Sequence, residues 1–239
     1  MKVLRNIFFI VILSIFMLYI PRLAGSFADL FDYRSIDPDG AYAWISVHHI
    51  FQALVFLPVM VILGKVYGLD FGFHWGDKSV GRKITLKFFL YFTIYNIGAY
   101  AFILLANGFE PFQFPLSANN ILGYMGFQLF LSGPSEELIF RAFAITLFAL
   151  VLKSSWIKGH VSAANILAAI IFAMAHMRFS FAPFEVSFIT MQLVLAFGLG
   201  IFYGICYEKS GSMYYPMMMH SFSNVMMVGT TIILSFILQ

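Results

Sequence analysis

The sequence predicts an all-α protein, a polytopic bundle of about seven transmembrane helices in which the fourth helix is broken. Three observations carry this prediction: 61% of the 239 residues are apolar, only 10% are charged, and the apolar residues form long continuous runs. Soluble domains carry roughly 25% charged residues, so this chain has too few charges to cover a soluble surface. The composition therefore excludes a soluble enzyme. The net charge of only +3 gives no reason to expect nucleic acid as a partner.

The apolar runs are those of membrane-spanning helices and not of a barrel. A barrel would show segments of about ten residues that alternate in polarity, whereas these runs are continuous and reach about twenty residues, the length of a spanning helix. They lie at about 4–24, 44–66, 86–106, 120–152, 161–179, 185–207 and 213–238. Residues 1–239 are therefore interpreted as a single integral membrane domain.

The basic residues divide unevenly between the two sets of loops that this topology creates. Ten Lys and Arg lie on the side of the N-terminus, three lie on the opposite side, and Arg141 lies within a span. Because Lys and Arg near span ends favour the cytoplasmic face, we expect a multi-pass protein of the cell membrane with a cytoplasmic N-terminus. The short loops and the lack of a eukaryotic sorting signal favour a bacterial membrane.

The fourth run, 120–152, is too long for one straight span. We expect Gly133-Pro134 to break it, with Pro134 opening a second half-helix. Glu136 and Glu137 then fall in the first turn of that half-helix, where the positive end of the helix dipole favours carboxylates. Inserting an ionisable residue at this depth of the bilayer costs about 2.5–3.5 kcal/mol of free energy. We therefore interpret this segment as a candidate functional site.

The spacing of these charges separates their roles. Glu137 and Arg141 are four residues apart on one helical face, in the favourable order for an ion pair. Glu136 lies about 100° round the helix and receives no partner from this segment. An unpaired carboxylate in an apolar site suits a general base. The alternative is a structural charge cluster that holds helices together.

Two later spans carry polar residues at a similar depth. His176 ends an apolar run on the fifth span, and His220 and Asn224 lie four residues apart on the last span, so they project from one face. A helical rise of 1.5 Å per residue places all three within about 10 Å of the depth of Glu136. Hydrogen bonding between helices is the plain alternative for each. His49, at the start of the second span, is expected at the outer headgroup border.

Together these motifs resemble those of the CPBP family, the CAAX proteases and bacteriocin-processing enzymes, also called the Abi family. The resemblance covers about residues 117–230 as a catalytic core, and within the family the chain is similar to the type II CAAX prenyl endopeptidases. The residues that carry it are Glu136-Glu137-x-x-x-Arg141, Phe172-x-x-x-His176 and His220-x-x-x-Asn224.

The resemblance implies an intramembrane endopeptidase, a hydrolase described both as a metalloendopeptidase and as a glutamate-dependent protease. It implies that Glu136 activates water, that His176 assists, and that His220 with Asn224 supports the oxyanion. A peptide precursor or a membrane-protein tail is the expected substrate, and the lipid bilayer is the expected surroundings. The sequence leaves the oligomeric state open.

The chemistry of the site leaves a choice about metal. Glu136, His176 and His220 would form a two-histidine, one-glutamate zinc set. The His-Glu-x-x-His helix typical of zinc proteases is absent, so the favoured interpretation requires no cofactor, with zinc as the alternative.

Two other functions remain as alternatives. The family also includes non-proteolytic membrane scaffolds and bacteriocin-immunity proteins. A proton-coupled transporter would use buried acids and histidines too, but it would show an inverted repeat with broken helices in both halves.

Overall fold

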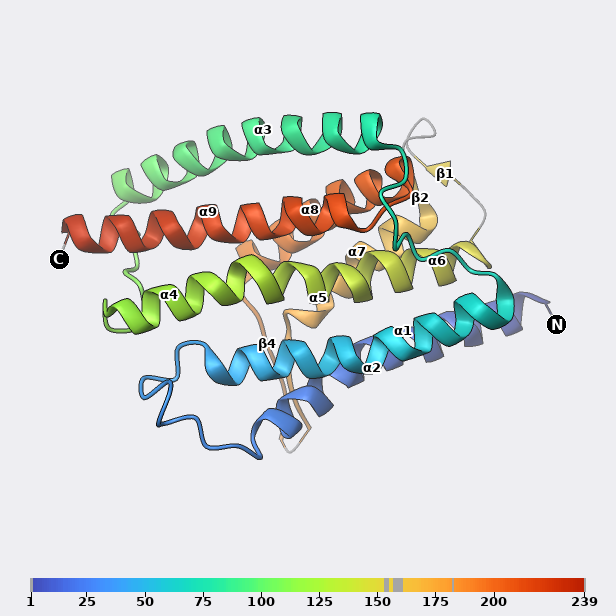
Figure 1. The fold of residues 1–239 in the computed structure, drawn as a ribbon, viewed down its shortest axis with the longest axis horizontal. Helices are drawn as coiled ribbons and strands as arrows, with labels where there is room; N and C mark the ends of the chain where they lie inside the picture. The colour runs from blue at the N-terminus through green and yellow to red at the C-terminus, as the bar shows by residue number, and fades with distance from the viewer. Residues whose placement is uncertain (1, 153–154, 157–160, 182, 239) are drawn as a thin grey trace.

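The computed structural model describes residues 2–152, 155–156, 161–181 and 183–238. The helices lie side by side as an elongated bundle, with the two chain termini at opposite ends (Figure 1). In chain order they are α1 (Lys2–Ala28), α2 (Ala43–Tyr67), α3 (Lys78–Leu105), a composite helix over 118–149, α7 (Ala163–Ala175), α8 (Thr190–Ser210) and α9 (Tyr214–Leu238).

Among the described residues, five of these helices are long and apolar enough to cross a membrane: α1, α2, α3, α8 and α9. The composite helix and the shorter apolar α7 correspond to the two remaining apolar runs of the sequence. The predicted all-α polytopic fold is therefore confirmed. Large apolar side chains stay exposed along the outside of the bundle, as expected where lipid rather than water is the neighbour.

The composite helix is irregular at the point where a break was expected. It consists of α4 (Ala118–Phe127), the π-helical segment η1 (Gln128–Ser132), α5 (Gly133–Glu137), a second π-helical segment η2 (Leu138–Phe143) and α6 (Ala144–Ala149). Pro134 lies in the first turn of α5, as the sequence predicts, but the chain stays helical on both sides of it. Because proline has no N–H to donate to the preceding turn, the widened turn of η1 accommodates it.

Polar side chains close the ends of the helices where the backbone lacks partners. Asp37, which is buried in the loop before α2, accepts hydrogen bonds from the backbone N–H groups of Ala41, Tyr42 and Ala43 at 2.7–2.8 Å. Without Asp37, these N–H groups would lack a hydrogen-bond acceptor at the start of α2. The carboxylate therefore takes the part of an N-cap for a helix whose own first residues offer none.

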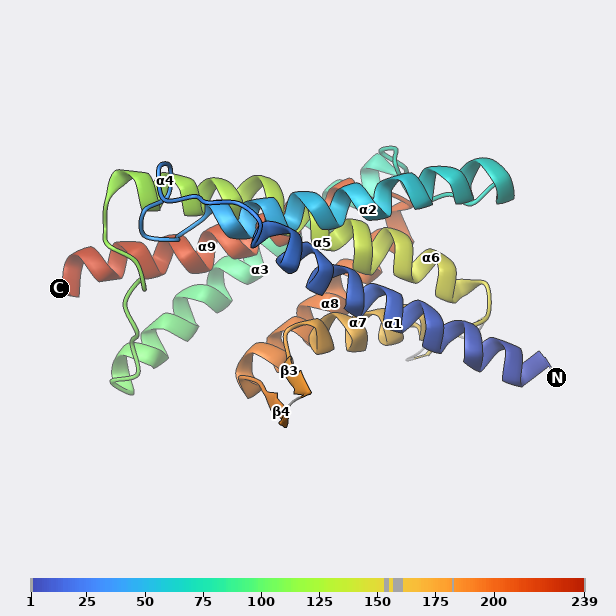
Figure 2. The same ribbon diagram turned by 90° about the horizontal axis from the view of Figure 1, so that it is seen from below.

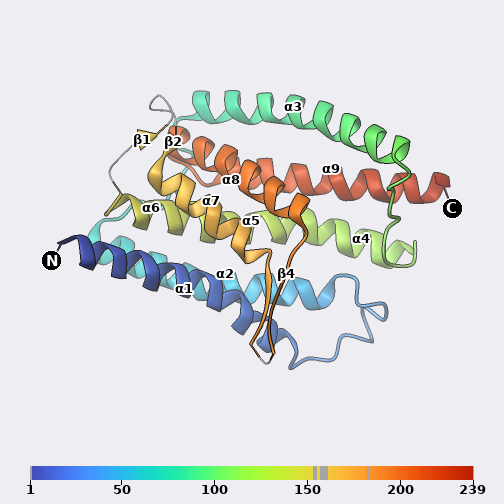
Figure 3. The ribbon, with the colours of Figure 1, turned by 180° about the vertical axis from the view of Figure 1, so that it is seen from behind.

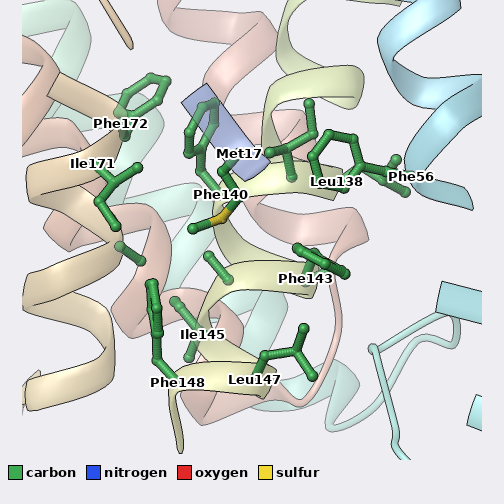
Figure 4. Close-up of a cluster of buried hydrophobic side chains, with 14 of the residues drawn as sticks. Met17, Phe56, Leu138, Phe140, Phe143, Ile145, Leu147, Phe148, Ile171 and Phe172 are labelled. Carbon is green, nitrogen blue, oxygen red and sulfur yellow. The ribbon is translucent and has the colours of Figure 1, made fainter. Parts of the chain in front are cut away.

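The core lies around the second half of the composite helix. Phe140, Phe143 and Phe148 point from it into a cluster of buried side chains that α1, α2 and α7 complete (Figure 4). The ring of Phe143 contacts that of Phe56 on α2 with centroids 5.0 Å apart, and the ring of Phe140 contacts that of Phe172 on α7 at 5.1 Å. This packing holds α5, which directly precedes the cluster, at the centre of the bundle.

A β-hairpin connects α7 to α8 and was not predicted from the sequence. Strands β3 (Arg178–Phe181) and β4 (Phe184–Ser187) pair antiparallel, with Arg178 opposite Ser187. The hairpin projects from these two helices toward the end of α1 (Figures 2 and 3), where the guanidinium of Arg22 lies 5.3 Å from the ring centroid of Phe179. A shorter antiparallel pair, β1 (Ser155–Trp156) and β2 (Val161–Ser162), precedes α7.

Candidate active site

The two adjacent carboxylates of α5 meet a histidine of α9 at the centre of the bundle. His220 lies with Nδ1 2.7 Å from Glu137 Oε1 and with Nε2 3.6 Å from Glu136 Oε2. One imidazole therefore faces both glutamates, one through each ring nitrogen. The contact depends on the close approach of α5 to α9.

Glu137 is fully buried between two basic side chains. Its Oε2 lies 3.0 Å from Arg141 Nε, one helical turn away, while its Oε1 faces His220. Since an ionised carboxylate can only accept hydrogen bonds, the Nδ1 of His220 carries the proton. In the neutral imidazole, Nε2 is then left with a lone pair directed toward Glu136.

Two aromatic rings complete the surroundings of the Arg141 guanidinium. Its guanidinium carbon lies 4.4 Å from the ring centroid of Phe172 and 5.2 Å from that of Tyr203. Among the described residues none accepts a hydrogen bond from the guanidinium nitrogens, so the ion pair with Glu137 and these ring faces offset the burial of the charge.

The imidazole of His220 is held in place by its neighbours. Tyr203 of α8 stacks on it with centroids 5.0 Å apart, and the Tyr203 hydroxyl lies 2.6 Å from Ser223 Oγ. Phe172 contacts the same imidazole edge to face at 5.8 Å. The ring is therefore clamped between α7 and α8 as well as bonded to α5.

Glu136 is the more open of the two carboxylates, with 18% of its side chain exposed. Its Oε2 faces His220 at 3.6 Å and its Oε1 faces Nε2 of His49 at 3.9 Å. Both separations are too long for a direct hydrogen bond and are spans that one water molecule can bridge.

Asn224 reaches the composite helix from α9. Its amide Nδ2 donates to Ser132 Oγ at 3.0 Å, one turn before the glutamates. The amide has a second N–H beyond this one. Asn224 and His220 thus project toward the same stretch of 132–137, as the spacing of four residues predicts.

His176 stands at the C-terminal end of α7 and contacts Phe172. Its Nδ1 lies 2.9 Å from the Phe172 carbonyl oxygen, and its ring meets the Phe172 ring at 4.9 Å. Within the part of the chain that the structure describes, no hydrogen bond or ion pair joins His176 to Glu136. Phe172, which contacts both imidazoles, is the link between His176 and His220.

His49 lies in the site, although the sequence places it at the headgroup border. Its side chain is 7% exposed, its Nε2 faces Glu136, and its Nδ1 lies 2.6 Å from Ser135 Oγ. Which helices become neighbours is a property of the packed bundle, so the apolar runs do not reveal this contact. The available signal is Gln52, which shares a helix face with His49 and makes the two a polar pair in an otherwise apolar span.

A groove leads from the side of the bundle to this site. It has a volume of about 280 Å³ and lies between α2 and the η1–α5 segment. His49 and Ser135 are part of its lining, and the rest is almost wholly apolar: Ile50, Ala53, Leu54, Leu57, Phe130, Leu131, Pro134, Leu138 and Met217.

The side chains that the structure describes do not form a three-ligand metal site. Over residues 2–152, 155–156, 161–181 and 183–238, no three His, Cys, Asp or Glu side chains are arranged so that they could hold one ion. In the zinc set expected from the sequence, His176 is turned to its own helix and to Phe172. That donor set therefore does not fit the arrangement seen here.

Comparison with known protein families gives a match over part of the chain. Residues 118–226 match the family model described as type II CAAX prenyl endopeptidase, Rce1-like. No curated protein and no solved structure matches the chain. The match contains all the motif residues named above, from Glu136 to Asn224, and it leaves α1, α2 and α3 outside. The family is named for proteases, and residues 118–226 of the chain are similar to it, in agreement with the motifs found in the sequence.

Proposed function

We propose that the chain is an intramembrane endopeptidase that hydrolyses a peptide bond near the membrane, with Glu136 as the base that activates water. The observation that carries this proposal is the contrast between two neighbouring carboxylates. Glu137 is paired with Arg141 and His220. Glu136 is instead partly exposed, and its carboxylate oxygens lie 3.6–3.9 Å from the Nε2 atoms of His220 and His49. A base needs a free lone pair next to a place for water, and Glu136 has both.

In this account His220 orients the attacking water, a role that replaces the oxyanion support that the family resemblance implies for it. Its Nδ1–H is held by Glu137, so its Nε2 accepts a hydrogen bond from a water that also contacts Glu136 Oε2. Glu136 takes a proton from that water as it attacks the carbonyl carbon, and the protonated carboxyl then gives the proton to the leaving amine. Glu137 and Arg141 act through His220 by fixing its tautomer and its position.

Asn224 is proposed as a donor to the oxyanion. Its free amide N–H is on the same face of α9 as His220, and a preorganised donor of this kind stabilises the tetrahedral intermediate. The assistance of His176, which the family resemblance implies, would be exerted through Phe172 and not by direct contact with Glu136.

The proposed mechanism uses no metal ion, with zinc as the alternative. Exhaustive chelation of the purified protein distinguishes the two. Retention of turnover agrees with the metal-free mechanism. Loss of turnover that zinc restores would contradict it and would call for ligands in addition to Glu136 and His220.

The substrate is proposed to be a peptide precursor or the tail of a membrane protein, which reaches Glu136 through the apolar groove beside α2. The test is cleavage by the purified chain in proteoliposomes, with a prenylated C-terminal peptide and unmodified membrane-anchored peptides offered in parallel. Glu136→Gln protein serves as the blank. Cleavage of at least one substrate, absent in the blank, supports the proposal. A folded wild-type chain that cleaves none of them would overturn it in favour of a non-proteolytic scaffold.

A further inference from the structure

We propose that His49 on α2 is a further catalytic residue, a neutral imidazole whose Nε2–H donates to the oxygen of the scissile carbonyl. The inference rests on the proposed endopeptidase function and extends its site to a helix outside the segment that matches the family. It is carried by two contacts that hold the ring, by a third contact that joins their partners, and by the direction in which Nε2 of His49 faces.

The ring of His49 is anchored through Nδ1. Ser135 Oγ lies 2.6 Å from this nitrogen and Gln52 Nε2 lies 3.0 Å from it. Gln52 Nε2 also donates to Ser135 Oγ at 3.1 Å, so the three side chains close a small ring of polar contacts. All three are buried, and Ser135 directly precedes Glu136 in the chain. The position of His49 is therefore tied to that of the base.

These contacts select one tautomer of His49. The amide nitrogen of Gln52 can only donate, so its approach to Nδ1 is favourable only if Nδ1 carries no proton. The Ser135 hydroxyl can donate to the same nitrogen. The proton of the neutral ring is therefore on Nε2, which faces Glu136 Oε1.

The Glu136 carboxylate thus lies between two imidazoles, one of which faces it with a hydrogen-bond donor and the other with an acceptor. His49 presents an N–H at 3.9 Å from Oε1, and His220 presents a lone pair at 3.6 Å from Oε2. A water held by Glu136 and His220 attacks the carbonyl carbon, and the carbonyl oxygen must then lie a few ångströms from the base. A donor about 4 Å from the base, on the side away from His220, is placed to receive the charge that develops there.

The position is also accessible to a substrate. His49 and Ser135 line the groove of about 280 Å³ between α2 and η1–α5, so a peptide backbone in this groove would pass the Nε2–H of His49 on its way to Glu136. Asn224 approaches from α9 and His49 from α2. The two donors would therefore contact the oxyanion from different helices.

A pair of substitutions separates donation from packing. His49→Gln keeps an N–H near the place of Nε2, and His49→Phe keeps a ring of similar size without any donor. We expect kcat to fall about 100- to 1000-fold for His49→Phe, the usual loss for one oxyanion donor, with KM changed less than about threefold. His49→Gln should retain at least about a tenth of wild-type kcat. His48→Phe is the matched control, because the His48 ring lies against Trp44 and α1, and it should cleave at the wild-type rate.

The outcomes distinguish this inference from the proposed function. If Glu136→Gln abolishes cleavage while His49→Phe keeps wild-type kcat, the proposal that Glu136 is the base is supported and the proposal that His49 donates to the oxyanion is overturned. If the wild-type chain cleaves nothing, both proposals fall together. Equal losses of kcat in His49→Gln and His49→Phe would also contradict donation.

The tautomer provides a readout that does not depend on turnover or on whether His49→Phe folds. In ¹⁵N NMR spectra of histidine-labelled wild-type protein, the His49 resonances are assigned by their loss in His49→Gln. They should show that Nε2 is protonated and that Nδ1 is unprotonated. A proton on Nδ1 would overturn the inference. Gln52→Leu removes one donor to Nδ1 and should lower kcat, with KM again nearly unchanged.

Discussion

Glu136 and Glu137 are neighbours in the sequence and lie in opposite surroundings in the structure. A helix turns about 100° per residue, so Glu137 faces Arg141 and the closed interior, whereas Glu136 is partly exposed and faces His49 and His220. Burial of a charge is tolerated only with partners, and Glu137 has both a guanidinium and an imidazole. The roles proposed for the two carboxylates, support for Glu137 and proton transfer for Glu136, follow from this single step of rotation.

The buried ion pair leads to the first prediction. Glu137→Gln or Arg141→Ala leaves an uncompensated charge in the core, so each should destabilise the protein by about 3–5 kcal/mol. Thermal unfolding of the purified variants in detergent measures the effect. Arg82→Ala, at an exposed position of α3, is the control and should leave the unfolding temperature unchanged. Wild-type unfolding temperatures for both core variants would show that the pair does not contribute to stability.

A second prediction concerns pH and the loop between α2 and α3. Asp70 Oδ2 lies 2.8 Å from His74 Nε2, and Asp70 Oδ1 accepts from the Gly72 N–H. The hydrogen bond with His74, aided by that from Gly72 and opposed by partial burial, holds the pKa of Asp70 below its ordinary value of about 3.9. A carboxylate with a depressed pKa contributes stability above its ordinary pKa, and this stability is lost as pH falls through the folded-state value.

The unfolding temperature should therefore decline as pH falls below about 4. In Asp70→Asn this part of the decline should be reduced, although the change is small because the pair is largely exposed, where such pairs contribute about 0.2–1 kcal/mol. Unfolding curves measured from pH 3 to 7 test this. Identical pH dependence in wild type and Asp70→Asn would contradict the assignment.

At the scale of the helices, the site depends on how closely α5 approaches α9. A Cβ on Gly133 would lie 2.7 Å from Ser221 Oγ and 2.8 Å from the Ser221 backbone nitrogen. Only glycine allows the two helices to meet at this distance. Glu136 follows Gly133 by three residues on α5, and His220 directly precedes Ser221 on α9. The contact between Gly133 and Ser221 therefore sets the separation between Glu136 and His220.

Gly133→Ala should therefore lower both the unfolding temperature and turnover, because it forces α5 and α9 apart. Gly126→Ala is a matched control on the same composite helix, since a Cβ there meets nothing within 4 Å. Alanine favours helix over glycine by about 1 kcal/mol, so the control should be as stable as wild type or more stable. A Gly133→Ala protein with normal stability and turnover would show that the close approach is not required.

The helices themselves could be predicted from the sequence, because a bilayer offers no partner to a bare peptide group and long apolar runs must be helical. Glu137 and Arg141 could be paired because an i,i+4 spacing is local. The hairpin Arg178–Ser187 was missed because its strands are apolar enough to merge with the spans assigned on either side. His49 was missed for a different reason: contacts between helices far apart in the chain cannot be read from either helix alone, and the pairing of His49 with Gln52 indicates only that this face of the helix is polar.

At the scale of the whole molecule, the bundle separates two sets of loops at its two ends (Figure 1). The basic loops lie at the end where the chain begins, and we predict that this end is cytoplasmic. Single cysteines in a Cys206→Ser background test the orientation with a membrane-impermeant thiol reagent on intact cells. Glu110→Cys, between α3 and α4, should react at once, and Ser79→Cys, at the start of α3, should react only after permeabilisation. The reverse pattern would place the N-terminus outside.

The measurement that tests the central claim most directly is the turnover of Glu136→Gln in proteoliposomes, compared with the wild type at equal amounts of folded protein. Glutamine keeps the size of the side chain and its hydrogen-bonding reach but accepts no proton at neutral pH. It also removes a charge that lacks an ion-pair partner in the cluster, so the unfolding temperature should be equal to or above that of the wild type. The account predicts a folded protein with no detectable cleavage. A Glu136→Gln protein that turns over near the wild-type rate would contradict it.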